Sequence, residues 1–89
     1  MLQSDSALDL RTKAPTAEMI KKFAANVGKE CEIDYKSGQV IEIPSLGRSY
    51  FVARIEHKGK CADGCEDTVL MRISGDKLIN IDTVAICDI

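Results

Sequence analysis

The feature that most constrains this chain is a pair of alternating segments between Ser49 and Ile73, which flank a loop with two cysteines. Successive side chains of a β-strand point to opposite faces, so alternation of apolar and polar residues predicts strands with one buried face. The positions expected to point inward are Phe51, Ala53, Ile55, Val69, Met71 and Ile73. This stretch predicts two strands at the centre of the fold.

The same period of two begins earlier, at Cys31. From Cys31 to Lys36 the odd positions are apolar and the even ones charged, and Gln39 to Ile43 forms a second apolar run. Ser37-Gly38 between them is typical of a tight turn, so this segment predicts a hairpin. Pro44 should end its second strand, because proline cannot donate a hydrogen bond to a neighbouring strand.

After a turn at Ser74-Gly75-Asp76, the chain continues with Lys77 to Ile81, a break at Asp82-Thr83, and a final run from Val84 to Ile89. The final run is apolar at both parities, unlike a strand that lies between core and solvent. We therefore expect it either to be buried on both faces or to pair with another chain. Self-association of the protein through Val84, Ile86 and Ile89 is the resulting prediction.

The N-terminal part has a different pattern. Residues 1–14 show no period and are expected to form a flexible arm. Thr16 is suited to cap a helix that runs from about Ala17 to Val27 with apolar residues at helical spacing, and Gly28 follows its last turn. The apolar side of this helix is expected to cover the sheet.

These elements predict one domain over residues 15–89, of the α+β class and mainly β. The N-terminal helix precedes a strongly bent antiparallel sheet of five or six strands, or a small barrel of Sm-like or SH3-like form. Bending and closure would remove the two exposed edges that a flat open sheet leaves for aggregation.

A helix, a bent antiparallel sheet and a late turn follow one another here, and Leu70 to Asp76 precedes Leu78-Ile79. This order and this segment resemble the Sm-like small barrels, whose late motif joins apolar residues, an Arg-Gly pair and more apolar residues. Ser74 stands where that arginine would precede Gly75. The family's Asp and Asn motif for uridine-rich RNA is missing, since Ser45 to Tyr50 offers only Arg48 and Tyr50. The resemblance implies a ring-forming architecture more than RNA binding.

His57, Cys61 and Cys65 are spaced four apart and form the only motif that resembles a metal or redox site. Thiolate and imidazole are the ligands of structural zinc, but a fourth ligand is not evident among Cys31 and Cys87. A disulfide between Cys61 and Cys65 is a second interpretation, and ordinary reduced thiols are a third. The acidic residues of this loop should raise the pKa of its thiols and oppose their reactivity.

Catalytic and nucleic-acid functions find less support. No catalytic residues are assigned, because no phosphate loop, paired carboxylates or oriented Cys-His pair is evident. The net charge of −2, from 12 basic and 14 acidic residues, does not favour nucleic acid. Still, a contact surface for a partner or for single-stranded RNA or DNA could combine the outward residues of the central strands with helix lysines: Tyr50, Arg54, Arg72, Lys21 and Lys22.

The sequence thus predicts a non-enzymatic binding or adaptor module that forms a homo-oligomer. A single-stranded RNA- or DNA-binding protein of Sm-like type is the first alternative, and a zinc- or redox-responsive protein using Cys61 and Cys65 is the second. No cofactor is expected apart from that zinc. A signal segment and a membrane span are not evident, so a cytoplasmic location with reduced cysteines is expected.

Overall fold

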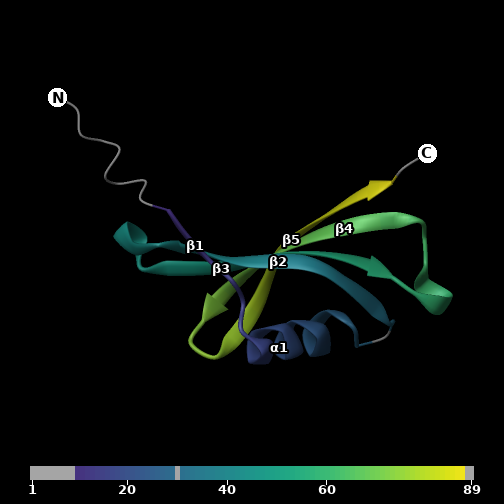
Figure 1. Cartoon of the computed structure of the whole chain (residues 1–89), viewed down its shortest axis with the longest axis horizontal. Coiled ribbons are helices and arrows are strands. Elements are labelled where there is room, and N and C mark those ends of the chain that lie inside the picture. Colours follow the sequence, from purple (N-terminus) through teal and green to yellow (C-terminus); the bar gives the residue numbers. More distant parts are fainter. Residues whose placement is uncertain (1–9, 30, 88–89) are drawn as a thin grey trace.

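In the computed structural model, which describes residues 10–29 and 31–87, one helix lies against one face of a single antiparallel sheet (Figure 1). The strands follow one another in space in the order β1-β2-β3-β4-β5. The elements are β1 Arg11–Lys13, α1 Ala17–Val27, β2 Ile33–Ile43, β3 Arg48–His57, β4 Cys65–Ser74 and β5 Lys77–Cys87, with short 3₁₀ turns at Pro44–Leu46 and Gly59–Cys61. The mainly β class and the antiparallel sheet are therefore confirmed.

Helix α1 has the predicted bounds. The Thr16 hydroxyl oxygen accepts a hydrogen bond from the Met19 backbone N–H at 3.2 Å, and Glu18 lies in the first turn, where the helix dipole favours a negative charge. At the other end, the Gly28 N–H donates to Ala24 O at 2.8 Å. Local side-chain chemistry thus accounts for both ends of the helix.

The core lies between α1 and the sheet. Phe23 of α1 is fully buried, and its ring meets those of Phe51 and Tyr35 edge-on, with centroids 5.2 and 6.1 Å apart. Such T-shaped contacts match the positive edge of one ring to the negative face of another. The inward parity predicted for β3 and β4 is confirmed, because the remaining core residues are Val40, Phe51, Ala53, Ile55, Val69 and Met71.

The predicted hairpin at Ser37-Gly38 is wrong, since β2 runs through this position as one strand. A register shift between Tyr35 and Ser37 leaves Lys36 as an extra residue, so that Tyr35 pairs with Ile55 and Gly38 with Ala53. The bulge moves the inward positions from odd to even numbers. Gly38 allows the backbone to approach these side chains closely, because a Cβ atom here would overlap the Tyr35 hydroxyl oxygen and lie 2.8 Å from the Phe51 ring.

Strand β5 is likewise continuous, and the expected break at Asp82-Thr83 is a bulge. Leu70 pairs with Asp82 but Met71 pairs with Asn80, which leaves Ile81 without a partner on β4. From Ile79 to Cys87 every residue is exposed, so burial of this strand on both faces within one chain is wrong. The alternative expected from the same pattern was pairing with another chain.

Closure into a small barrel is not confirmed. Strands β1 and β5 lie at opposite edges of the sheet in the part of the chain that the structure describes. Arg11–Lys13, within the segment expected to be an arm, pairs with Val40 to Glu42 as β1, while residues 1–9 of that arm lie outside the described residues. In residues 10–29 and 31–87, no helix is long and apolar enough to cross a membrane.

Candidate functional site

The cysteines are paired by the strand register and not by their spacing along the chain. Cys65 begins β4 directly opposite Cys87 at the end of β5, and the two form a disulfide with a Cα–Cα distance of 4.1 Å. Cys31, just before β2, forms a second disulfide with Cys61, and their Cα atoms lie 5.9 Å apart. The expectation of reduced thiols and the alternative of a Cys61–Cys65 disulfide are both corrected by this pairing.

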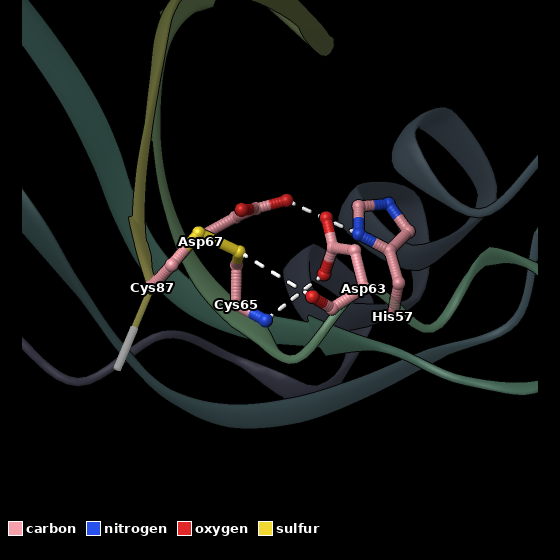
Figure 2. The surroundings of a disulfide bond; sticks show 5 residues. All are labelled: His57, Asp63, Cys65, Asp67 and Cys87. Atoms are coloured by element: carbon pink, nitrogen blue, oxygen red, sulfur yellow. Dashed lines mark hydrogen bonds and ion pairs between the residues drawn. A yellow bond between two sulfur atoms is a disulfide. The ribbon is translucent and has the colours of Figure 1, made fainter. Parts of the chain in front are cut away.

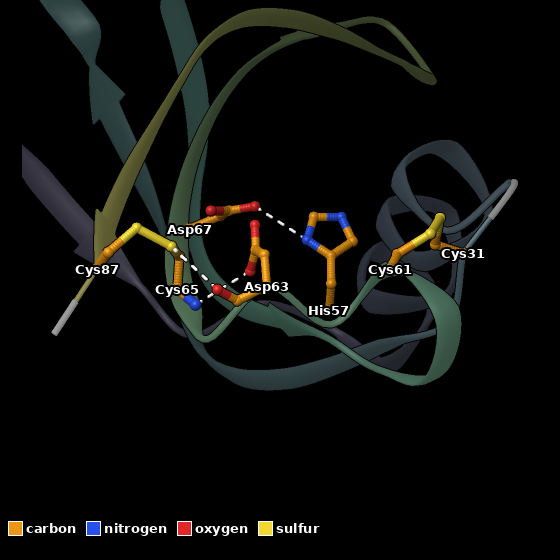
Figure 3. A network of polar contacts seen from close by, with 7 residues as sticks. All are labelled: Cys31, His57, Cys61, Asp63, Cys65, Asp67 and Cys87. Carbon is orange, nitrogen blue, oxygen red and sulfur yellow. Dashed lines mark hydrogen bonds and ion pairs between the residues drawn. A yellow bond between two sulfur atoms is a disulfide. The ribbon is translucent and has the colours of Figure 1, made fainter. Parts of the chain in front are cut away.

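His57, Cys61 and Cys65 are not assembled as one set of ligands. Figure 3 shows the His57 ring between the two disulfides, with Cys65–Cys87 on one side and Cys31–Cys61 on the other, near α1. No group of three or more metal-ligating side chains occurs among the residues that the structure describes. Since a disulfide sulfur is not a thiolate ligand, zinc binding would require reduction of both disulfides.

His57 has a specific partner in Asp67. The His57 Nδ1 atom lies 3.1 Å from Asp67 Oδ2, a hydrogen bond that becomes an ion pair when the imidazole is protonated (Figure 2). Asp67 is 6% exposed, and its other oxygen, Oδ1, is buried and has no hydrogen-bond partner among residues 10–29 and 31–87. Buried polar atoms without a partner are uncommon, and functional sites are one place where they occur.

Sequence reasoning missed the role of Asp67 by assigning it to the acidic loop. Asp67 is already within β4 and pairs with Ile55 of β3 on one side and Ala85 of β5 on the other. The sequence did contain a sign of this, because Asp67 is two positions from Val69 and four from Met71. In a strand it therefore points to the same face as these two buried residues. A carboxylate at an inward position of a strand predicts a specific partner.

Asp63 organises the start of β4 beside this pair. Its Oδ1 atom accepts a hydrogen bond from the Cys65 N–H at 3.0 Å, and its backbone oxygen lies 3.6 Å from Cys65 Sγ (Figure 2). The sulfur of a disulfide has no hydrogen, so this second approach is a contact in the oxidised protein. Reduction would turn it into a hydrogen bond from a thiol.

The residues expected to form one nucleic-acid or partner surface are divided between two faces. Tyr50 pairs with Arg72 and Arg54 with Thr68, all at positions whose side chains alternate with the buried ones and so lie on the face away from α1. Arg54 already binds Glu66 with two nitrogens, Nε at 2.7 Å. Lys22 donates to Asp76 O at 2.9 Å, and with Lys21 it belongs to the helix on the other face.

The two edges of the sheet differ in length and charge. Strand β1 is short and contributes Arg11 and Lys13, and Lys13 pairs with Glu42 at 3.2 Å. Strand β5 spans eleven residues, and between Leu78 and Cys87 its only charged residue is Asp82, which accepts a hydrogen bond from the Thr83 N–H. Ile79, Val84 and Ile86 are 47%, 53% and 62% exposed. Ile89 lies outside the described residues.

Models of protein families, curated proteins and solved structures were compared with this chain, and none of them matches it. Its function therefore has to be argued from the geometry of the two features above, the β5 edge and the His57–Asp67 pair beside a disulfide.

Proposed function

We propose that this chain is a non-enzymatic binding module that self-associates by pairing the β5 edges of two copies. The observation that carries the proposal is the exposure of Val84 and Ile86 on an edge strand whose segment from Leu78 to Cys87 has a single charged residue. Edge strands of monomeric proteins are normally short, charged or covered. Strand β1 follows that rule and β5 does not, so β5 is the edge suited to a partner.

A second copy is the occupant that fits this edge. In an antiparallel pair around a two-fold axis, Thr83 to Cys87 of one copy would meet the same uncharged segment of the other, and no like charges would be brought together within that segment. Val84 and Ile86 lie opposite Thr68 and Glu66 of β4, on the face away from α1. Side chains at these two positions would meet across the axis and lose their exposure to water.

Light scattering over a concentration series tests the proposal. We expect the oxidised protein to have twice the mass of one chain, and Ile86→Lys to reduce it to that of a monomer. Leu46→Lys is the matched control, because Leu46 is 60% exposed but lies in the 3₁₀ turn between β2 and β3. A monomeric wild-type mass at every concentration would contradict the proposal.

The single-stranded RNA or DNA alternative is supported only by Tyr50 and its cross-strand neighbour Arg72, since Arg54 is paired and the helix lysines belong to the other face. An aromatic ring beside a guanidinium can stack on a base. Salt-sensitive binding of a short single strand that is lost in Tyr50→Ala would favour this alternative over self-association alone.

The redox alternative, in contrast, gains support from the two disulfides. Stable disulfides are typical of oxidising compartments, so they favour such a compartment over the cytoplasm for this protein.

The ring architecture of Sm-like barrels would require a closed sheet in the assembled state. Pairing of β5 with another chain would occur both in an Sm-like arrangement and in a simple dimer.

A further inference from the structure

We infer that the Cys65–Cys87 disulfide is a thiol-exchange site, at which a small-molecule thiol forms a mixed disulfide with Cys87 while His57 supplies a proton to Cys65. This inference goes beyond β5 pairing and concerns the chain whose β5 edge is unpaired, because pairing through Thr83 to Cys87 would cover Cys87. Three observations support it: the difference in exposure between Cys65 and Cys87, the His57–Asp67 pair, and the Asp67 oxygen described above as lacking a hydrogen-bond partner.

The two cysteines of this disulfide differ in accessibility. Cys87 is exposed at the end of the edge strand β5, whereas Cys65 is 8% exposed. Exchange requires a thiolate to approach one sulfur along the sulfur–sulfur axis, and access decides which sulfur is attacked. Attack on Cys87 makes Cys65 the leaving group, in the buried position next to the polar cluster.

The leaving sulfur needs a proton at this position. Asp63 contacts Cys65 through two of its atoms, and Asp67 lies two residues further along the same face of β4. These carboxylates oppose a negative charge on sulfur. A proton donor beside Cys65 would remove that charge as it forms.

His57 is placed to be this donor. Glu56 pairs with Glu66, so the next residues in the same register are His57 and Cys65, on neighbouring strands and on the inward face. Figure 3 shows the imidazole on the same side of the sheet as the Cys65–Cys87 sulfurs. Asp67 of β4 binds the ring, Asp63 of the loop before β4 lies beside it in Figure 3, and Lys58 follows His57 in the chain.

Asp67 is a positioning residue in this arrangement. Its Oδ2 atom holds Nδ1 of His57 at 3.1 Å, which fixes the orientation of the ring. Within the described part of the chain, the buried Oδ1 atom has no hydrogen-bond partner while the disulfide is intact. Exchange creates a thiol at Cys65, two residues away on the same face, and thereby supplies a new hydrogen-bond donor to this region.

The step balances without an external oxidant. The thiolate of the small molecule forms a sulfur–sulfur bond with Cys87, and the Cys65–Cys87 bond breaks. Cys65 leaves with the electron pair and takes the proton of His57 Nδ1, the ring nitrogen on the side of the Cys65–Cys87 disulfide in Figure 3, and the imidazole recovers a proton from solvent. The incoming thiol released its own proton to solvent, so the products are a mixed disulfide on Cys87 and a thiol at Cys65.

The test uses the oxidised full chain at a concentration at which light scattering gives the mass of one chain, with reduced glutathione as the thiol and Cys31–Cys61 as an internal control. After quenching and alkylation, cleavage before Asp63 separates Cys61 from Cys65 for peptide mass spectrometry. We expect glutathione on Cys87 and an alkylated Cys65 while Cys31–Cys61 is still intact. In the wild-type protein, equal rates of exchange at the two disulfides, or a first glutathione adduct on Cys31 or Cys61, would overturn the inference.

Variants then test the two polar residues. We expect His57→Gln to slow exchange at Cys65–Cys87 by about a hundredfold, and to leave exchange at Cys31–Cys61 unchanged. The ratio of wild-type to variant rates should fall as the pH rises, because only the protonated imidazole donates. Asp67→Asn should also slow exchange, and the double variant should be no slower than His57→Gln. An unchanged rate in a folded His57→Gln protein would contradict the role of His57.

Discussion

Gly38 lies where the Tyr35 hydroxyl and the Phe51 ring approach the backbone of β2. In the sequence, Ser37-Gly38 has the composition of a turn, but glycine also occurs within strands where another group approaches the backbone closely. Which role applies depends on side chains of other strands. The inward positions of β3 and β4, in contrast, follow from alternation alone and could be predicted.

At Gly38 we predict that Gly38→Ala destabilises the fold by about 1–3 kcal/mol, although alanine has less backbone freedom to lose than glycine. The added Cβ would lie 2.8 Å from a ring that is fully buried. The free energy of unfolding in urea measures the effect. Adding Tyr35→Phe, which removes the nearest contact, should recover part of the loss; a Gly38→Ala protein as stable as the wild type would contradict the packing described.

Tyr35 is expected to titrate late. Burial raises the pKa of Tyr35 above its ordinary value of about 10, because the charged phenolate is disfavoured there. The folded state therefore prefers the neutral phenol, and this contribution to stability is present below the unfolded pKa and is lost as the pH rises through the folded pKa.

Tyrosinate absorbance measures that titration, and the chain has only two tyrosines. The difference between wild type and Tyr35→Phe isolates Tyr35, with Tyr50 present in both proteins. We expect a midpoint above 10. A difference curve with the midpoint of a free tyrosine would show that the phenol is solvated in the folded state.

At the scale of elements, the bounds of α1 agree with the predicted range of about Ala17 to Val27, because both ends depend on adjacent residues. The Thr16 cap is one such local contact. We predict that Thr16→Ala lowers the free energy of unfolding by about 1 kcal/mol, since it leaves the Met19 N–H without its partner. Thr16→Ser keeps the hydroxyl and should stay close to wild type in the same denaturation experiment. An equal loss in both variants would contradict the capping role.

The strands were predicted less completely than the helix, because two bulges break their alternation. The extra residues, Lys36 in β2 and Ile81 in β5, change which parity faces the core. Bulges depend on the fit between neighbouring strands, so a single alternating pattern does not reveal them. The short β1 has no pattern of its own and exists through its pairing with β2.

The cysteine pairing at the candidate site could not be predicted either, because it also depends on contacts between neighbouring strands. Four cysteines allow three sets of pairings, and spacing along the chain suggested Cys61 with Cys65. Pairing between strands brings Cys87 opposite Cys65 instead. His57 was identified from the sequence, whereas its partner Asp67 required the register of β3 and β4.

For the whole molecule, the two disulfides add constraints to a chain of 89 residues, a size at which a single core gives limited stability. Cys31 and Cys61 are 30 positions apart, and loop-closure entropy for such a separation corresponds to about 3–4 kcal/mol. We predict a loss of that size when both are replaced by alanine, measured by urea denaturation under oxidising conditions. Equal stability of the two proteins would show that this disulfide does not constrain the unfolded chain.

The central claim concerns the unequal edges of the sheet, a short basic β1 and a long, mostly uncharged β5. Hydrogen exchange of the oxidised protein over a concentration series tests it most directly, because pairing of two chains protects backbone amides at the new interface. We predict that amides of Thr83 to Cys87 become more protected as the concentration rises, whereas those of Arg11–Lys13 do not change. Exchange in β5 that is independent of concentration, in a sample whose mass is that of a dimer, would contradict association through this edge.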